Sequence, residues 1–221
     1  MCSAALVWLS FSDSPAIARV DVNGARHVRV GQAVAQSGLL DEPAFIASAG
    51  EARRRLRALP AVRDARVEIT LPGAARITLV ERVAIGRWVA SNGLEWFVDA
   101  EGFLFPSADA GGAPDLRVFD ERGARTPGER IDPALVLAAL RLAGLGPGEL
   151  RADATAPRVV MTAGATGLAL RFGTGWEIRF GGPENFEEKL ALARRYLRDN
   201  PQRRLDYVDV RSADRIVVSP Q

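Results

Sequence analysis

The hydrophobic and polar positions of residues 16–83 repeat with the periods of strands and helices, in a simple order. Three segments in which apolar and polar residues alternate are predicted as strands: residues 17–22, 62–71 and 76–82. Two segments with apolar residues at helical spacing are predicted as helices: residues 31–37, ended by Gly38, and about 45–59, stopped by Pro60. The order strand–helix–helix–strand–strand predicts a complete two-layer α/β unit.

Residues 84–221 follow a different pattern, in which short strand-like runs are separated by turns. Asn92-Gly93 and Glu101-Gly102 are hairpin signals between the runs around Val89, Trp96 and Phe103–Phe105. Five later segments are also predicted as strands: residues 159–162, 168–172, 176–180, 205–210 and 215–218. Together these runs favour one mainly antiparallel sheet.

Two helices interrupt the strands of this second part. The first is predicted over residues 133–143, with Asp132 as its N-cap and Gly144 as its terminator. The second is predicted over residues 183–199, which are acidic at the start and basic at the end, as the helix dipole favours. The predicted fold class is therefore α+β: an α/β unit followed by a mainly antiparallel β domain with two helices.

The apolar run at residues 4–11 has two interpretations. It is shorter than the roughly 20 apolar residues that a membrane-spanning helix needs. Residues 1–3 carry no charge, which argues against a secretory signal. Residues 1–15 are therefore interpreted either as the remnant of a transmembrane anchor that begins outside this chain or as a disordered terminus.

The composition excludes several kinds of chemistry. A formal net charge of only +2 argues against a polybasic surface for nucleic acid. The single cysteine, Cys2, excludes an intrachain disulfide and a cysteine-rich zinc site, and the single histidine, His27, excludes a histidine-cluster metal centre. The only lysine, Lys189, lies between Glu188 and Leu190 and does not complete a Walker-type phosphate loop.

Residues that resemble catalytic or binding motifs are better explained by local structure. Gly173-Thr174-Gly175 joins two predicted strands and is typical of a tight hairpin rather than a nucleotide loop. Asp99 and Glu101 flank a turn without a partner for acid–base chemistry, and Arg53-Arg54-Arg55 is typical of a solvated helix face. No catalytic, cofactor-binding or metal-binding residue is predicted, and we do not expect an enzyme.

Short motifs follow one another along the chain with the order and spacing of a known family. Three of them resemble motifs of the FtsQ-type POTRA domain: Val20–Gly24 (VDVNG), Leu59–Val67 (LPAVRDARV) and Ile77–Arg82 (ITLVER). Three later ones are similar to motifs of the β domain that follows it: Trp96–Phe105 (WFVDAEGFLF), Lys189-Leu190 and Tyr207–Arg211 (YVDVR). The chain departs from the usual pattern at Ala61, Leu71 and Ala84. It is identified as a divergent member of the FtsQ/DivIB family of bacterial cell-division proteins.

The resemblance implies a non-enzymatic scaffold of the divisome at the division septum. Such a protein spans the cytoplasmic membrane once, with both domains on the extracytoplasmic side. It joins the FtsB–FtsL complex to septal peptidoglycan synthesis, and FtsK, FtsW and FtsI are further candidate partners. The implied domains are the anchor remnant or disordered terminus (1–15), the POTRA domain (16–83) and the β domain (84–221). The POTRA face bearing Val20–Gly24, the second helix and the third strand is expected to lie near the membrane.

Two other classes of protein stay open at this point. A POTRA domain also occurs in outer-membrane assembly and secretion components, which are the main alternative. A small periplasmic hydrolase that uses Asp99 or Glu101 is the enzymatic alternative, although no convergent acid and base accompany these two carboxylates.

The last predicted strand is the candidate partner-binding element. If it lies at the border of the sheet, its backbone is open to an incoming strand; otherwise it is an ordinary core strand. The resemblance implies that FtsB adds a strand here and brings acidic side chains to nearby basic residues. The predicted contact residues are Arg211, Ser212, Arg215, Ile216, Val217 and Val218.

Overall fold

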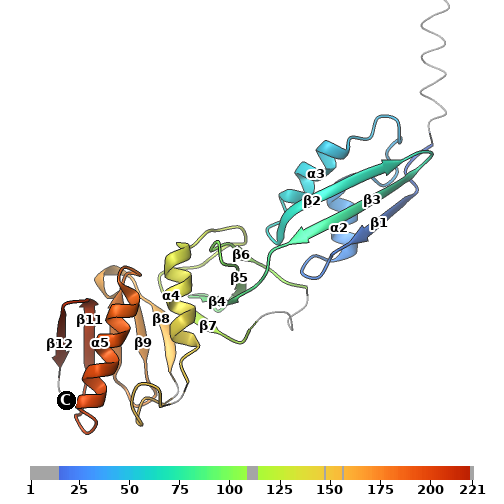
Figure 1. The fold of residues 1–221 in the computed structure, drawn as a ribbon. Helices are drawn as coiled ribbons and strands as arrows, with labels where there is room; N and C mark the ends of the chain where they lie inside the picture. Colours follow the sequence, from blue (N-terminus) through green and yellow to red (C-terminus); the bar gives the residue numbers. More distant parts are fainter. Residues whose placement is uncertain (1–14, 109–113, 147, 156, 220–221) are drawn as a thin grey trace, which may run out of the picture. The chain divides into compact units, whose positions relative to one another are not determined.

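The computed structural model describes residues 15–108, 114–146, 148–155 and 157–219 (Figure 1). Backbone contacts divide the described chain into two compact units. Residues 15–82 and 106–108 form unit 1, and the described residues from 83 to 105 and from 114 onward form unit 2.

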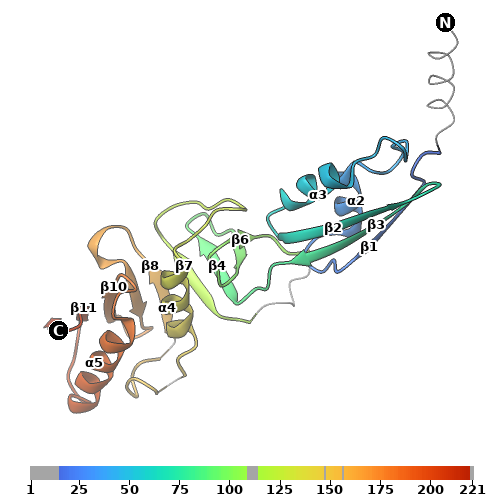
Figure 2. The same ribbon diagram turned by 45° about the horizontal axis from the view of Figure 1, so that its top comes forward.

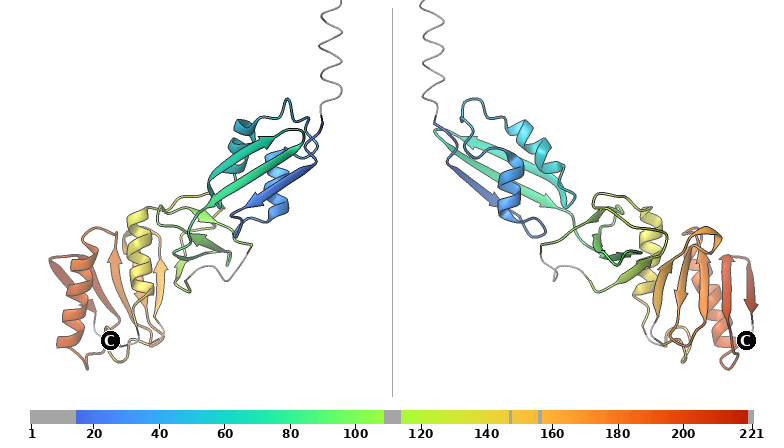
Figure 3. Two further views of the ribbon diagram at one scale, coloured as in Figure 1. Left: turned by 45° about the vertical axis from the view of Figure 1, so that its right-hand side comes forward. Right: turned by 180° about the vertical axis from the view of Figure 1, so that it is seen from behind.

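Unit 1 is a three-stranded sheet covered on one face by two helices (Figures 1 and 3). Its elements are β1 (Arg19–Asn23), α2 (Val30–Ser37), α3 (Ala49–Arg57), β2 (Val62–Thr70) and β3 (Ala74–Glu81). β3 is central, parallel to β1 and antiparallel to β2. Buried side chains from both layers form the core, among them Ala33, Ala52, Leu56, Ile77 and Leu79. The predicted order of elements is confirmed.

The start of α3 differs from the predicted helix over residues 45–59. Ser48 caps α3, because its side-chain oxygen accepts a hydrogen bond from the Glu51 N–H at 3.2 Å. Phe45 and Ile46 consequently lie in the preceding loop, with 68% and 56% of their surface exposed. Their spacing imitates the apolar stripe of a helix, but the capping signal decides where the helix begins.

Unit 2 is built on a nine-stranded mixed sheet. Its strands are β4 (Gly86–Ala90), β5 (Glu95–Val98), β6 (Leu104–Phe105), β7 (Arg117–Asp120), β8 (Arg158–Met161), β9 (Leu168–Arg171), β10 (Glu177–Gly181), β11 (Tyr207–Ser212) and β12 (Arg215–Ser219). They lie in the order β12-β11-β10-β9-β8-β7-β4-β5-β6. The pairs β4–β7, β7–β8 and β10–β11 are parallel, and the other five neighbouring pairs are antiparallel.

Two helices, α4 (Pro133–Ala143) and α5 (Phe186–Asp199), lie on one face of this sheet (Figures 1 and 2). α4 has the predicted bounds, and the Asp132 carboxylate caps it by accepting from the Ala134 N–H at 3.0 Å. α5 begins three residues later than predicted, after Asn185. A single hydrophobic cluster fills the space between helices and sheet, with Val136, Leu190 and Leu197 on the helix side.

β7 is a strand that the hydrophobic pattern does not predict. Its inward positions are Val118 and Asp120, so that one of the two buried residues carries a charge. The Asp120 carboxylate accepts hydrogen bonds from Trp88 Nε1 at 2.9 Å, from Arg122 at 2.8 Å and from Arg125 at 3.0 Å. These bonds tie β4, β7 and the segment after β7 together around one buried charge.

Candidate partner-binding edge of the β domain

β12 forms the border of the nine-stranded sheet. On one side its backbone pairs with β11, with Val208 opposite Val218 and Asp209 opposite Val217. On its other side, no strand of the described chain pairs with it. An edge strand of this kind presents backbone N–H and C=O groups to which another chain can add a strand.

The side chains of β12 alternate between the core and solvent. Ile216 and Val218 pack against the hydrophobic cluster under the helices. Arg215 and Val217 are exposed on the opposite face, Val217 to 45% of its surface. This is the predicted distribution of side chains, and it offers an incoming strand both a backbone ladder and an apolar side chain beside a cation.

Arg211 is already engaged within the domain. Its guanidinium lies 2.7 Å from the Asp209 carboxylate and also donates to the Ala165 carbonyl at 3.3 Å. Burial alone would raise the pKa of Asp209, but the hydrogen bonds from Arg211 outweigh it and the pKa is lowered. Gly181, with φ of 72°, leaves room for the stem of Arg211, since a Cβ there would lie 3.0 Å from Arg211 Cγ. Arg211 therefore has a structural role beside the edge strand, because its guanidinium is held by Asp209 and by the Ala165 carbonyl.

The Arg215 guanidinium forms no side-chain hydrogen bond or close ion pair with another described residue, although its charge contributes to lowering the pKa of Asp214. Ser212, by contrast, donates its hydroxyl to Asp214 within the β11–β12 turn. Arg215 and Val217 line a hollow of about 340 Å³ beside the strand, together with Gly181, Gly182 and Ala165. Of the two predicted basic contacts, Arg215 is thus the one with its charge available to a partner.

Lys189 lies next to the edge, and its position is not evident from the sequence. This lysine is 4% exposed, its Nζ donates to the Gly182 carbonyl at 3.1 Å, and burial lowers its pKa. The bond joins the first turn of α5 to the end of β10. Lys189 also lines a polar hollow with Ser212 and Asp214 on the β11–β12 turn.

The residues weighed as candidate catalytic groups have structural roles. Asp99 is buried, and its carboxylate accepts from the N–H groups of Glu101 and Phe103 at 3.0 and 2.9 Å, which makes it the organiser of a turn, as predicted. His27, the single histidine, is half-buried, and its Nδ1 lies 2.8 Å from the Ser107 hydroxyl within unit 1.

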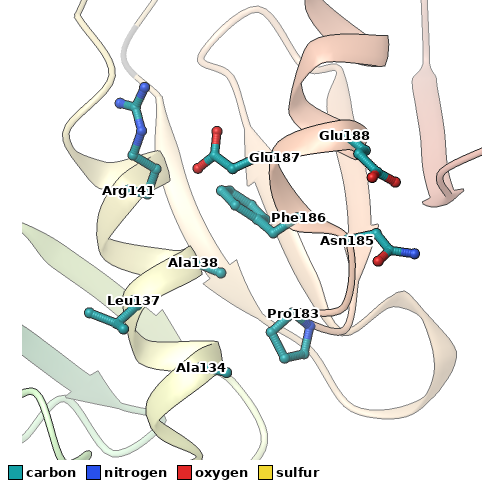
Figure 4. A pocket seen from close by; sticks show the side chains of 9 residues that line it. All are labelled: Ala134, Leu137, Ala138, Arg141, Pro183, Asn185, Phe186, Glu187 and Glu188. Carbon is teal, nitrogen blue, oxygen red and sulfur yellow. The ribbon is translucent and has the colours of Figure 1, made fainter.

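A hollow of about 620 Å³ lies between α4 and α5 of unit 2 (Figure 4). Ala138 and Phe186 give it apolar walls between the two helices, and the charged side chains of Arg141 and Glu187 lie at its rim. It brings together no nucleophile with a base. Within the described parts of the chain, no group of three or more histidine, cysteine, aspartate or glutamate side chains could hold a metal ion.

Residues 16–82 match the family model of the FtsQ-type POTRA domain. The chain is 28% identical over 209 residues to Cell division protein FtsQ of Chloroflexus aurantiacus, an alignment that covers 94% of this chain and 75% of that protein. The same figures hold for Cell division protein FtsQ of Chloroflexus aggregans. The FtsQ of Caulobacter vibrioides is 32% identical over 116 residues, or 49% of this chain and 38% of that protein.

The fold therefore defines a POTRA-domain protein with a C-terminal β domain. Residues 16–82 form an FtsQ-type POTRA domain, and over 94% of its length the chain is similar to proteins named Cell division protein FtsQ, which supports a role in cell division. Among the helices in the described residues, none has the length and apolar character needed to cross a membrane.

Proposed function

We propose that this chain is a non-enzymatic scaffold of the divisome whose β12 edge takes up a strand of FtsB held in complex with FtsL. This contact would join the FtsB–FtsL complex to septal peptidoglycan synthesis. The observation that carries the proposal is the open edge of β12, with Val217 and Arg215 exposed along it. An acidic partner strand would place its carboxylates near Arg215 while its backbone extends the sheet.

The proposal includes a place for the chain in the cell. A single N-terminal span would anchor it in the cytoplasmic membrane at the septum, with both domains on the extracytoplasmic side. FtsK, FtsW and FtsI are further proposed partners. The relatives named as cell-division proteins support this role over that of an outer-membrane assembly or secretion component.

The first test removes a backbone donor from the edge. Val217→Pro takes one N–H out of β12 and introduces a ring that does not fit a paired strand. We expect affinity for a purified FtsB–FtsL fragment, measured by calorimetry, to fall by about a hundredfold or more because the ladder is broken. The matched control is Val217→Thr, which keeps the β-branched shape and the N–H and should bind nearly as the parent does. Full binding by Val217→Pro would exclude strand addition at β12.

The second test reverses one charge at the edge. Arg215→Glu should weaken binding of the FtsB–FtsL fragment by about tenfold, because it sets a carboxylate against an acidic partner. The weakening should shrink at high salt. Arg204→Glu makes the same charge change at an exposed position before β11 and should leave binding unchanged. Equal losses in the two variants would show that only net charge matters and would remove Arg215 from the interface.

A further inference from the structure

The exposed large apolar side chains of unit 1 gather at one end. Six such side chains occur in its described residues: Val30, Leu40, Phe45, Ile46, Leu71 and Val80. Four of them, Leu40, Phe45, Ile46 and Leu71, belong either to the loop between α2 and α3 or to the turn between β2 and β3. We call these four residues the apolar tip. They are 48%, 68%, 56% and 66% exposed, respectively.

Backbone hydrogen bonds hold the loop and the turn around the start of the described chain (Figure 1). In the loop, the Ala44 N–H donates to the Pro15 carbonyl at 3.0 Å and the Ile17 N–H donates to the Glu42 carbonyl at 2.9 Å. In the turn, the Gly73 carbonyl accepts from the Ala18 N–H at 3.0 Å. The apolar tip is therefore assembled on the segment through which the chain enters unit 1.

The remaining open face of the sheet has a different character. Arg66 of β2 lies opposite Thr78 of β3, and Glu68 lies opposite Arg76, all four outside the core. These polar residues lie on the sheet face that the helices leave open, where Val80 is the one large apolar side chain exposed among the described residues. The surface of unit 1 is thus polar along the sheet and apolar at the end where residue 15 enters, a separation that marks the end as an interaction surface.

We infer that the apolar tip inserts into the interfacial region of a lipid bilayer. The apolar run of residues 4–11 ends four residues before Pro15, so any bilayer that takes up this run lies within reach of the tip. The four side chains come from two separate loops and are each about half exposed or more, an arrangement that suits a fluid hydrocarbon boundary. This assignment goes beyond the proposed binding of FtsB and needs no protein partner.

The charged residues near the apolar tip determine which force can drive its insertion into a bilayer. Asp41 and Glu42 lie in the same loop as Phe45, so anionic headgroups offer no electrostatic gain there. Insertion must therefore be driven by apolar area and be insensitive to salt. The tip is also at the opposite end of β1 from Gly24, so the end carrying Pro15, rather than the expected face bearing Val20–Gly24, is the one that meets the membrane.

The experiment places a polarity-sensitive NBD label at single cysteines in the full 221-residue chain, with Cys2→Ser as background. An N-terminal histidine tag holds every variant equally on phosphatidylcholine vesicles doped with a nickel-chelating lipid. Labels at Phe45→Cys and Leu71→Cys should shift to the blue and be quenched by shallow doxyl lipids. The control is Leu94→Cys, which replaces a side chain of unit 2 that is equally apolar and 50% exposed, and its label should keep the spectrum seen in water.

A second measurement uses the untagged chain and its partition onto the same vesicles without the chelating lipid. Phe45→Ser combined with Ile46→Ser should lower the partition coefficient about tenfold, whereas Leu94→Ser should leave it unchanged. Because Asp41 and Glu42 lie beside the tip, added phosphatidylglycerol should not strengthen insertion and 0.5 M NaCl should not weaken it. Unshifted labels at both tip positions on the tethered chain would overturn the inference, whatever the outcome of the FtsB–FtsL binding tests.

Discussion

Asp120→Ala is expected to destabilise unit 2 by about 3 kcal/mol or more. The substitution leaves Trp88 Nε1 and the guanidinium groups of Arg122 and Arg125 without the carboxylate that pairs them, in a place where that carboxylate is fully buried. Urea unfolding followed by tryptophan fluorescence measures the loss, because Trp88, Trp96 and Trp176 all lie in unit 2. An unchanged midpoint would show that the network contributes nothing.

The same carboxylate predicts a pH dependence. Burial alone would raise the pKa of Asp120, but the hydrogen bonds from Arg122 and Trp88 outweigh it and lower the pKa to about 2 from 3.8. Because the folded-state pKa is the lower one, the stabilisation is complete above about pH 4 and is lost as the pH falls toward 2. Asp120→Asn keeps a hydrogen-bond acceptor but removes the charge. The difference in free energy of unfolding between this variant and the parent should therefore shrink as the pH falls from about 4 to 2. A constant difference from pH 7 to pH 2 would contradict the charged network.

Gly102→Ala is expected to lower the free energy of unfolding of unit 2 by more than about 4 kcal/mol. A loss of this size is exceptional for a single substitution. Gly102 has φ of 84°, and a Cβ there would lie 2.0 Å from the Ile131 carbonyl oxygen. That carbonyl is backbone and cannot move alone, because the Ile131 N–H donates to the Gly102 carbonyl at 2.9 Å. The free energy of unfolding, again from urea titration, measures the effect.

Gly93→Ala is the matched control for this clash. Gly93 has nearly the same φ, 80°, in another hairpin of the same domain, but a Cβ there would meet nothing within 4 Å. Gly93→Ala should lower the free energy of unfolding only by the cost of placing alanine in the left-handed conformation, about 1–2 kcal/mol. If the two variants lose equal stability, backbone conformation and not the contact with Ile131 explains the requirement for glycine at position 102.

The elements that the sequence predicts correctly are those with strong local signals. α4 has its predicted bounds because Asp132, Pro133 and Gly144 each act within a few residues of the helix ends. β12 has the predicted alternation because Ile216 and Val218 are apolar on the core side. The motif residue Glu81, by contrast, acts between distant segments, since its carboxylate accepts from the backbone N–H groups of Arg26, His27 and Val28 at 2.7–2.9 Å.

The features that the sequence does not reveal depend on contacts between distant segments. β7 is missed because one of its two core positions is Asp120, whose partners Trp88 and Arg125 belong to other segments. The engagement of Arg211 with Ala165 is likewise invisible in a linear pattern, so Arg211 and Arg215 look equivalent until the fold separates them. The apolar tip is missed because Phe45 was consistent with a helix that extended too far toward the N-terminus.

The two border strands of the nine-stranded sheet, β12 and β6, differ in whether another segment covers them, and this bears on how many partner strands the β domain could take up. At the β6 end, Leu104 is covered by residues 128–131, since its N–H donates to the Glu129 carbonyl and its carbonyl accepts from the Gly128 N–H. Among the described residues β12 is therefore the open border of the sheet, and the proposed strand addition would be confined to it, with one partner strand per domain. A pair of chains joined through β12 would use up both edges and form a closed dimer rather than a filament. If partners bind by the proposed strand addition, such a domain would end an assembly rather than extend it.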